Sequence, residues 1–291
     1  MSMEIVPFFE EQSCTWTYLV ADSRSGDAAI IDPVWTYEPV SGRAGRAYTD
    51  RILDRARQRG WTVQWVLETH AHADHLSSGG LVREATGARL AIGQGIRAVQ
   101  QTFRKVYNLP GLATDGSQFD RLLGEGDEIP LGGLTVRAME TPGHTSDSIS
   151  YVVEDAAFIG DTLFAPDAGT ARCDFPGGDA GRLFDSIQRI YALPGDTRLF
   201  LCHNYPSEGK DPMMMVTVEE SRRSNIHIQE NTSRDNYVSM RQRRDAKLSL
   251  PKLILPAIQV NVLGGRAPAA EDNGFSYLKI PFNTSLAEIL R

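Results

Sequence analysis

Four side chains that can bind a metal lie within six consecutive residues, at positions 70–75. His70 and His72 are separated by one residue, so both imidazoles point to the same side of an extended segment. Asp74 and His75 follow directly after them. Imidazole and carboxylate groups this close together in a sequence are typical of a site that binds a cation. The segment therefore predicts a metal centre.

Other parts of the chain supply further candidate ligands. The chain has six histidines, and His144 and His203 each follow a predicted strand. Asp161 follows an apolar strand and a glycine, where its carboxylate could bind one metal or bridge two. His144 alone could be a turn histidine bonded to the backbone, and His227 is expected to be structural or on the surface. Nitrogen and oxygen donors without thiolate leave Zn, Fe, Mn, Ni and Co open.

The composition narrows the class of protein. Apolar residues make up 41% and charged residues 23%, which is ordinary for a soluble globular chain. No stretch approaches the ~20 apolar residues of a membrane span, and we expect no signal peptide. The net charge of −7 argues against nucleic-acid binding. The predicted partners therefore exclude nucleic acid and membrane.

The cysteines bear on the cellular compartment. Cys14, Cys173 and Cys202 form an odd, sparse set, which fits a reducing compartment and hence a cytoplasmic location. Cys202 precedes His203 in a predicted strand, so we expect the two side chains to point to opposite faces.

Short β-rich runs alternate with helical patterns along the first 206 residues. The expected strands are 15–21, 28–31, 62–68, 89–92, 128–131, 134–140, 148–153, 156–159 and 198–201, and the expected helices are 48–59, 76–86, 94–106 and 181–191. This alternation predicts an α/β (α+β) chain with helical layers on β-sheets. The candidate ligands fall in loops at strand ends, where function concentrates on a rigid scaffold.

The character of the sequence changes after about Pro206. We predict helices at 216–228 and 237–248, the latter basic, then an apolar segment at 253–260, a loop at 264–273, and a short strand or extended tail at 278–282. We interpret residues 1–291 as a single domain, with a core of about 1–210 and a helical and extended C-terminal extension of about 211–291. The apolar tail could dock on a neighbour, so a homodimer is possible.

Five separated motifs resemble those of the metallo-β-lactamase superfamily. They cover about the first 210 residues in the right order: Ile31-Asp32-Pro33, Thr69 to His75, Thr141 to Thr145, Gly160 to Phe164, and Cys202 to Tyr205. The resemblance implies an αββα four-layer sandwich with a metal site at one edge of the sheets. It also implies that all seven ligand positions of the superfamily are filled, by His70, His72, Asp74, His75, His144, Asp161 and His203.

The same resemblance points to two glutathione-linked branches. Asp161 stands where the common lactamases typically carry a cysteine. Persulfide dioxygenases (sulfur dioxygenases) resemble Gly-x-x-Arg-x-Asp-Phe at positions 169–175, which this chain matches while differing at Thr170-Ala171. The segment after Tyr205 also resembles the larger bacterial persulfide dioxygenases. Glyoxalase II, a hydroxyacylglutathione hydrolase, is the alternative.

The resemblance carries specific expectations for the site. A persulfide dioxygenase oxidises glutathione persulfide with O2 to sulfite and glutathione at one mononuclear non-haem Fe(II) per chain, which here implies His70, His144 and Asp161 as ligands. His72, Asp74, His75 and His203 then orient the ligands or form a second site. The candidate substrate contacts are Arg172, as a clamp for a glutathione carboxylate, and less strongly Tyr205 and Lys210. The alternative is a thioester hydrolase, of this or another kind on the same fold, with one or two Zn ions.

Overall fold

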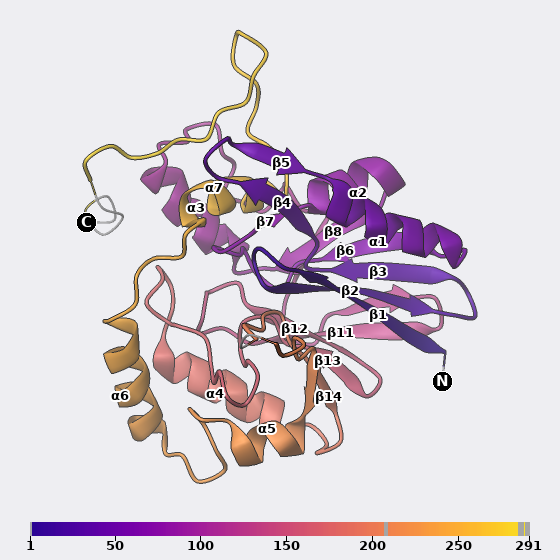
Figure 1. Cartoon of the computed structure of the whole chain (residues 1–291), viewed down its shortest axis with the longest axis vertical. Helices are drawn as coiled ribbons and strands as arrows, with labels where there is room; N and C mark the ends of the chain where they lie inside the picture. Colours follow the sequence, from indigo (N-terminus) through magenta and orange to yellow (C-terminus); the bar gives the residue numbers. More distant parts are fainter. Residues whose placement is uncertain (1, 207–208, 285–287, 289–291) are drawn as a thin grey trace.

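Two six-stranded β-sheets form the centre of the computed structural model, which describes residues 2–206, 209–284 and 288 (Figure 1). The first sheet has the order β1-β2-β3-β6-β8-β9, with bounds Met3–Glu10, Thr15–Asp22, Asp27–Ile31, Thr62–Leu67, Arg89–Gly93 and Arg121–Leu123. The second has the order β10 to β15, with bounds Glu128–Leu131, Leu134–Glu140, Ile149–Val153, Ala156–Phe158, Arg198–Phe200 and Met215–Thr217. Both sheets are mixed: β3 and β6 pair in parallel, as do β13 and β14, while β1 and β2 pair antiparallel.

The two sheets pack face to face, and the alternation of side chains along each strand explains why. On β2, Tyr18 and Val20 join the core between the sheets, whereas Leu19 and Ala21 join the core on the outer face. The second sheet sends Val136 and Phe158 into the same central core. Because successive residues of a strand point to opposite faces, each sheet has two apolar sides and needs a cover on both.

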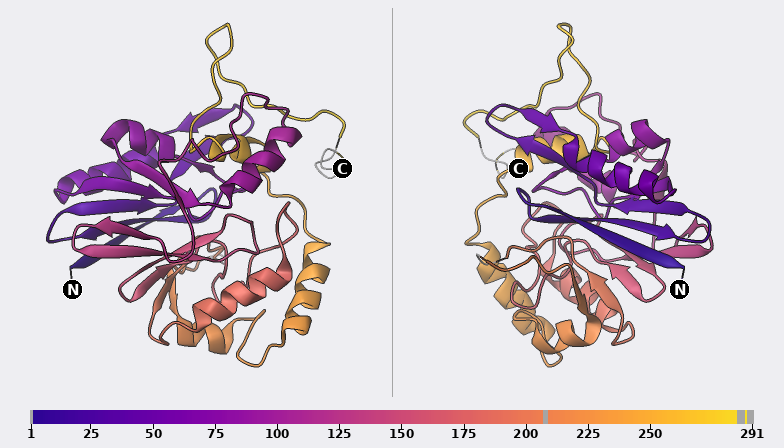
Figure 2. Two further views of the ribbon diagram at one scale, coloured as in Figure 1. Left: turned by 180° about the vertical axis from the view of Figure 1, so that it is seen from behind. Right: turned by 45° about the vertical axis from the view of Figure 1, so that its right-hand side comes forward.

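Helices provide the outer cover of both sheets (Figures 1 and 2). The first sheet carries α1 (Ala47–Gln58), α2 (Gly79–Thr86), α3 (Ile96–Val106) and α7 (Ile254–Asn261), and the second carries α4 (Ala180–Tyr191), α5 (Val218–Ser224) and α6 (Arg234–Asp245). A small third sheet joins β5 (Arg43–Gly45), β4 (Val34–Glu38) and β7 (Leu76–Ser77). The predicted αββα four-layer sandwich is confirmed.

Several element boundaries differ from the sequence-based prediction. Positions 76–77 form β7, which pairs with β4, so the helix predicted at 76–86 begins at Gly79. The helix predicted at 216–228 covers only Val218–Ser224, because residues 215–217 pair with β14 and the Asn225 side chain accepts the next turn's backbone N–H groups. The apolar segment 253–260 is mostly the helix α7, and no strand is assigned at 278–282.

The residues after about 210 add to layers that already exist. They supply β15, α5 and α6 to the second sheet and α7 to the first. The chain then leaves the body as a long loop and tail, drawn in yellow in Figures 1 and 2. Phe275, Ile280 and Phe282 on this tail are exposed, while Gln259 is hydrogen-bonded to the Lys279 backbone and anchors it. The division at about residue 210 and the possible homodimer stay predictions.

In the described part of the chain, no helix is both long and apolar enough to span a bilayer.

We expect Phe158→Ala to lower the free energy of unfolding by about 3–5 kcal/mol, because it leaves a cavity in the core between the sheets. The Phe158 ring lies 5.2 Å from that of Tyr18 and 4.9 Å from that of Phe200, measured between centroids. Urea denaturation at fixed metal content measures the change. Val40→Ala, at a position that is 95% exposed, is the control and should change stability by less than about 0.5 kcal/mol. Equal stability of the two variants would contradict the assigned core.

Candidate metal centre

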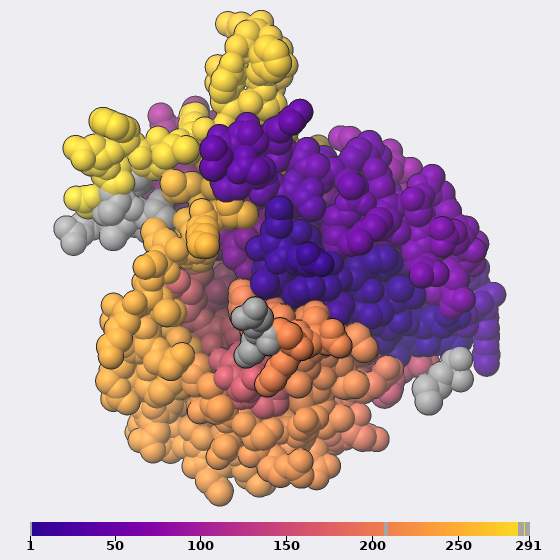
Figure 3. Space-filling model, in the orientation of Figure 1, coloured from indigo at the N-terminus to yellow at the C-terminus, as the bar shows by residue number. Residues whose placement is uncertain are grey.

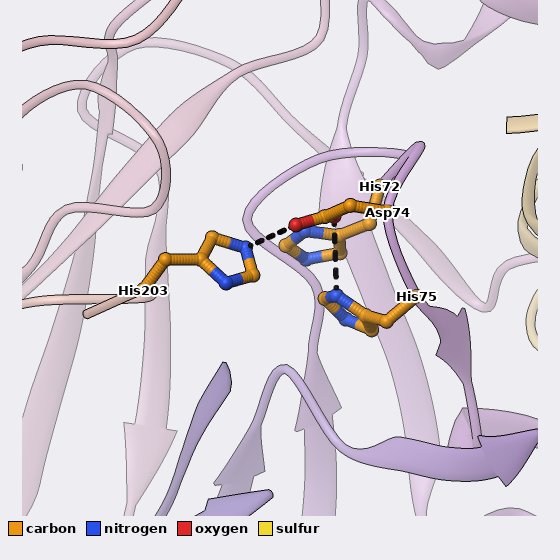
Figure 4. A group of neighbouring side chains, drawn as sticks. All are labelled: His72, Asp74, His75 and His203. Carbon is orange, nitrogen blue, oxygen red and sulfur yellow. Dashed lines mark ion pairs between the residues drawn. The ribbon is translucent and has the colours of Figure 1, made fainter. Parts of the chain in front are cut away.

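Strand ends from both sheets deliver the candidate ligands to one place. His70 lies just beyond the end of β6 in the first sheet. His144, Asp161 and His203 follow β11, β13 and β14 of the second sheet. Figure 4 shows His203 approaching from the opposite side to the three labelled residues of the segment 70–75. The structure therefore brings together all seven predicted metal-binding side chains at one edge of the sandwich.

Asp161 joins two of the histidines in a compact set. Its Oδ2 lies 3.8 Å from His70 Nε2 and 3.7 Å from His144 Nε2. Two donors that are each about 2.1 Å from a shared ion lie at most ~4.2 Å apart. Both separations are below that limit, and all three side chains are buried. His70, His144 and Asp161 can therefore hold one ion.

A second set of candidate ligands, drawn in Figure 4, lies beside the first. His72, Asp74, His75 and His203 offer ligand atoms that lie within 4.8 Å of one another. His203 Nε2 is 3.1 Å from Asp74 Oδ2, and Asp161 Oδ1 is 3.4 Å from His203 Nε2. Asp161 thus turns one oxygen to each set, as a carboxylate that bridges two ions would. The geometry allows one ion or two.

Hydrogen bonds outside the two sets fix which nitrogen of the His144 and His70 rings faces inward. His144 Nδ1 lies 2.7 Å from the Arg172 carbonyl, so Nδ1 carries the proton and donates. His70 Nδ1 lies 3.1 Å from Thr69 Oγ1, and that hydroxyl donates to Asp32 Oδ2 at 2.8 Å. Since the Thr69 hydroxyl has used its proton, His70 Nδ1 is the donor to it. Both rings therefore turn an Nε2 lone pair to the centre, as a metal ligand must.

The imidazole nitrogens that have no hydrogen-bond partner indicate whether the site fits a cation. His70 Nε2 and His75 Nε2 are buried and have no hydrogen-bond partner among the described residues. Burial, and then the neighbouring imidazoles, hold the pKa of His70 and of His72 well below its usual value, so both rings are neutral near pH 7. A buried nitrogen without a partner costs free energy, and a metal ion supplies the missing partner. The donor set therefore fits a metal ion.

The carboxylates shape the charge of the second set. Burial opposes the charged forms of Asp74 and His203, but charged and hydrogen-bonding neighbours outweigh it: His203 and then His75 for Asp74, and Asp161 and then Asp74 for His203. As a result the pKa of Asp74 is held well below its usual range, and the pKa of His203 is raised. Asp161 differs: burial is the main cause and raises the pKa of its carboxyl. Without a cation the charge of the Asp161 carboxylate would be poorly compensated.

Two side chains near the centre were not expected there. Asp32 is buried and accepts hydrogen bonds from the Thr69 backbone and hydroxyl, with His72 Nε2 at 3.1 Å. Its position in the Ile31-Asp32-Pro33 motif is the sequence signal for it. The prediction that Cys202 points away from His203 is wrong, since its Sγ lies within 4.8 Å of ligand atoms of His72, Asp161 and His203. Strand β14 ends at Phe200, so the alternation of sides stops before Cys202.

A cavity of about 450 Å³ opens on the first set and is lined by His144, Asp161 and Asp74. Figure 3 shows the surface hollowed beside the chain that leads from α6 to α7, whose Leu248 and Pro251 line the same cavity. A second cavity, of about 570 Å³, shares only Asp74 and Tyr205 with the first and is lined on its own side by His75. The centre is thus reachable from two sides.

The predicted substrate contacts lie differently with respect to these cavities. Arg172 lines the first, but its guanidinium already binds Asp174 at 2.6 and 2.7 Å and the Ser249 carbonyl. Tyr205 lines both, with its ring stacked on that of His203 at 6.1 Å between centroids. Lys210 is exposed and lines neither of these two cavities. Their roles in substrate binding stay predictions.

The C-terminal part adds cavity residues that the sequence analysis did not place at the site. His227, Arg241 and Arg244 line the first cavity. Arg241 is buried and bonded to Asp245 and to the Thr170 carbonyl, whereas Arg244 is exposed. The basic character of the helix predicted at 237–248 was the available signal, but which of its basic residues faces the cavity depends on how the helix packs.

We expect Thr69→Val to weaken metal binding by roughly 10- to 100-fold, because it removes the group that orients His70 and links it to Asp32. Titration with a competing chelator measures the affinity. Thr69→Ser keeps the hydroxyl and serves as the matched control, with an affinity near that of the wild type. Equal affinities of the Val and Ser variants would show that this hydroxyl does not orient the ligand.

Comparison with known proteins places the centre in a family. The metallo-beta-lactamase superfamily profile matches residues 14–203. A probable metallo-hydrolase of Burkholderia pseudomallei is 48% identical over 97% of this chain and 99% of that protein. Glyoxylase B2 of Dictyostelium discoideum is 42% identical over 96% of this chain and 97% of that protein. Persulfide dioxygenase ETHE1 of Mus musculus is 31% identical, over 76% of this chain and 74% of that protein.

The structural comparison agrees with these relatives. The crystal structure of ETHE1 from Myxococcus xanthus aligns with a TM-score of 0.73 and 30% sequence identity, covering 91% of this chain and 100% of that one. The predicted resemblance is therefore confirmed: the chain belongs to the metallo-beta-lactamase superfamily, with persulfide dioxygenases of the ETHE1 type among its relatives.

Proposed function

We propose that the chain is a persulfide dioxygenase, which oxidises glutathione persulfide with O2 to sulfite and glutathione at one Fe(II) held by His70, His144 and Asp161. The observation that carries the proposal is that this set, two of whose members line the 450 Å³ cavity, combines two imidazoles with one carboxylate. Such a set with open positions is the arrangement of non-haem Fe(II) oxygenases. Ferrous iron held by these three residues would supply open coordination positions and the electrons that activate O2.

The protein's own groups complete the site. The carbonyl of Arg172 holds the His144 ring in place. Phe164 and Phe175 form apolar walls of the cavity and limit the access of water. Glutathione carries two carboxylates, and the basic side chains on the cavity wall would attract these negative charges. The 31% sequence identity to the persulfide dioxygenase of Mus musculus also supports a dioxygenase function.

A thiolester hydrolase with two metal ions is the second candidate function. The complete second set and the position of Asp161 between the two sets favour it. The Burkholderia and Dictyostelium relatives, named as a probable metallo-hydrolase and as glyoxylase B2, also favour hydrolysis or glyoxalase-type chemistry. In that case the two ions would activate a water molecule for attack on the thioester carbonyl. The two candidates differ in metal content and in their need for O2.

We expect the protein loaded anaerobically with Fe(II) to hold one iron per chain and to consume O2 when glutathione persulfide is added. The reaction GSSH + O2 + H2O gives GSH, sulfite and two protons, so one sulfite forms for each O2. An oxygen electrode and a sulfite assay measure both. Removal of iron by a chelator should abolish the uptake, and restored Fe(II) should recover it.

The hydrolase predicts a different set of results. Two ions per chain, cleavage of S-lactoylglutathione, and no uptake of O2 with the persulfide would establish the hydrolase and refute the dioxygenase. His70→Ala should lose activity in either case, so it controls for dependence on the metal centre and does not separate the two.

A further inference from the structure

His227 lies where the chain passes from α5 to α6, far along the sequence from the metal ligands, yet it lines the same cavity as His144 and Asp161. The sequence assigned it a structural or surface role. One hydrogen bond orients its ring, and a second holds its backbone in place. Its Nδ1 accepts a hydrogen bond from the Thr170 backbone N–H at 2.9 Å, and its own backbone N–H donates to Asn225 Oδ1 at 3.0 Å.

The loop 169–175 packs closely against this ring. Asn225 is buried, and its Nδ2 donates to the Gly169 carbonyl at 3.0 Å, which fixes the two segments together. Gly169 has a φ of +90°, and a Cβ added there would lie 2.1 Å from His227 Nδ1. Only glycine meets both conditions. The ring is therefore built against this loop and does not rest loosely on the surface.

The contacts also settle where the proton of the ring lies. Because Nδ1 accepts a backbone N–H, the neutral ring carries its hydrogen on Nε2. Burial, and then Arg244 and Arg241, lower the pKa of His227 to about 4, so the ring is neutral near pH 7. Nε2 is buried and has no hydrogen-bond partner among the described residues. A buried donor without a partner is rare in folded proteins and calls for an explanation.

Arg244 supplies a charge to the same cavity. Its side chain is exposed, and among the described residues no ion pair or hydrogen bond of its guanidinium is found. The other two arginines of the cavity are already engaged, Arg172 with Asp174 and Arg241 with Asp245. The residues that line the cavity therefore include one neutral ring whose buried N–H has no partner among the described residues, and one uncommitted cation.

We propose that His227 Nε2–H and Arg244 form a subsite for a carboxylate of the thiol carrier, and so determine which thiol the enzyme accepts. The inference rests on the proposed function, since it takes the cavity to bind a glutathione-like thiol with its sulfur at the metal centre. His227 is a specificity-determining residue and takes no part in the chemical step. A carboxylate accepts hydrogen bonds from both groups, and Arg244 supplies the opposite charge.

The test compares two persulfides on the iron-loaded protein, glutathione persulfide and mercaptoethanol persulfide, which has no carboxylate. His227→Asn keeps an acceptor for the Thr170 N–H and removes the distal N–H. We expect its KM for glutathione persulfide to rise roughly 10- to 100-fold, the usual effect of losing a hydrogen bond to a charged group. Its kcat should stay near wild type, and its kinetics with mercaptoethanol persulfide should change less than about twofold. His227→Gln, which retains a distal amide N–H, should recover part of the loss.

A pair of neighbouring arginines gives the matched control for charge. Arg244→Gln should raise the KM for glutathione persulfide in the same way, whereas Arg243→Gln should not. Arg243 is exposed on the same helix and lies outside the lining of the cavity. Thermal melting and iron content of each variant show that fold and metal centre are intact.

The outcomes separate this subsite from the proposed function. If the wild type consumes no O2, the dioxygenase proposal fails, and calorimetric binding of glutathione to the zinc-loaded wild type and His227→Asn then tests the subsite. Binding that weakens in the variant supports it. Equal binding by the two proteins, no binding by either, or equal kinetic losses with both persulfides would each overturn it.

Discussion

The burial of unsatisfied imidazole nitrogens at one edge of the sandwich is the constraint on which the rest of the structure depends. His70 Nε2 and His75 Nε2 are buried and have no hydrogen-bond partner in the part of the chain that the structure describes, and Asp161 is buried between the two ligand sets. Such a cluster is destabilising in a folded chain unless a cation compensates it. The two-sheet core must therefore be stable enough to hold these groups in place, which the large apolar clusters on both sides of each sheet achieve.

Groups outside the ligand sets turn this cost into a defined geometry. The Thr69 hydroxyl and Asp32 fix the His70 ring, and the Arg172 carbonyl fixes the His144 ring. Asp32 itself is buried; burial raises the pKa of its carboxyl to about 6, against the hydrogen bonds from Thr69 that favour the charged form. These partners come from strand ends and loops of both sheets, so displacing one sheet against the other would misalign the ligands. The packing of the two sheets therefore fixes the orientation of the His70 and His144 rings.

The sequence allowed the donors to be predicted because they are marked locally. Alternating and apolar runs locate the strands, and His70, His144, Asp161 and His203 each follow one, so their convergence needed only the rule that function lies at strand ends. The parts that were wrong depend on distant contacts. Cys202 lies beyond the last paired residue of its strand, and the helix predicted at 216–228 begins late because residues 215–217 pair with β14. No local pattern records either event.

The predicted metal ligands and the C-terminal wall of the cavity come from different parts of the chain. All seven predicted ligands fall within residues 14–203, the part that matches the superfamily. His227, Arg244 and Leu248 lie beyond it and form one wall of the cavity onto which that centre opens. The loop 169–175 contacts both parts. The carbonyl of Arg172 in this loop accepts a hydrogen bond from the predicted ligand His144, and the Thr170 N–H donates to His227. Under the proposed function, changes in the C-terminal wall would alter which thiol is bound while the metal ligands keep their positions, because substrate contacts and ligands come from different parts of the chain.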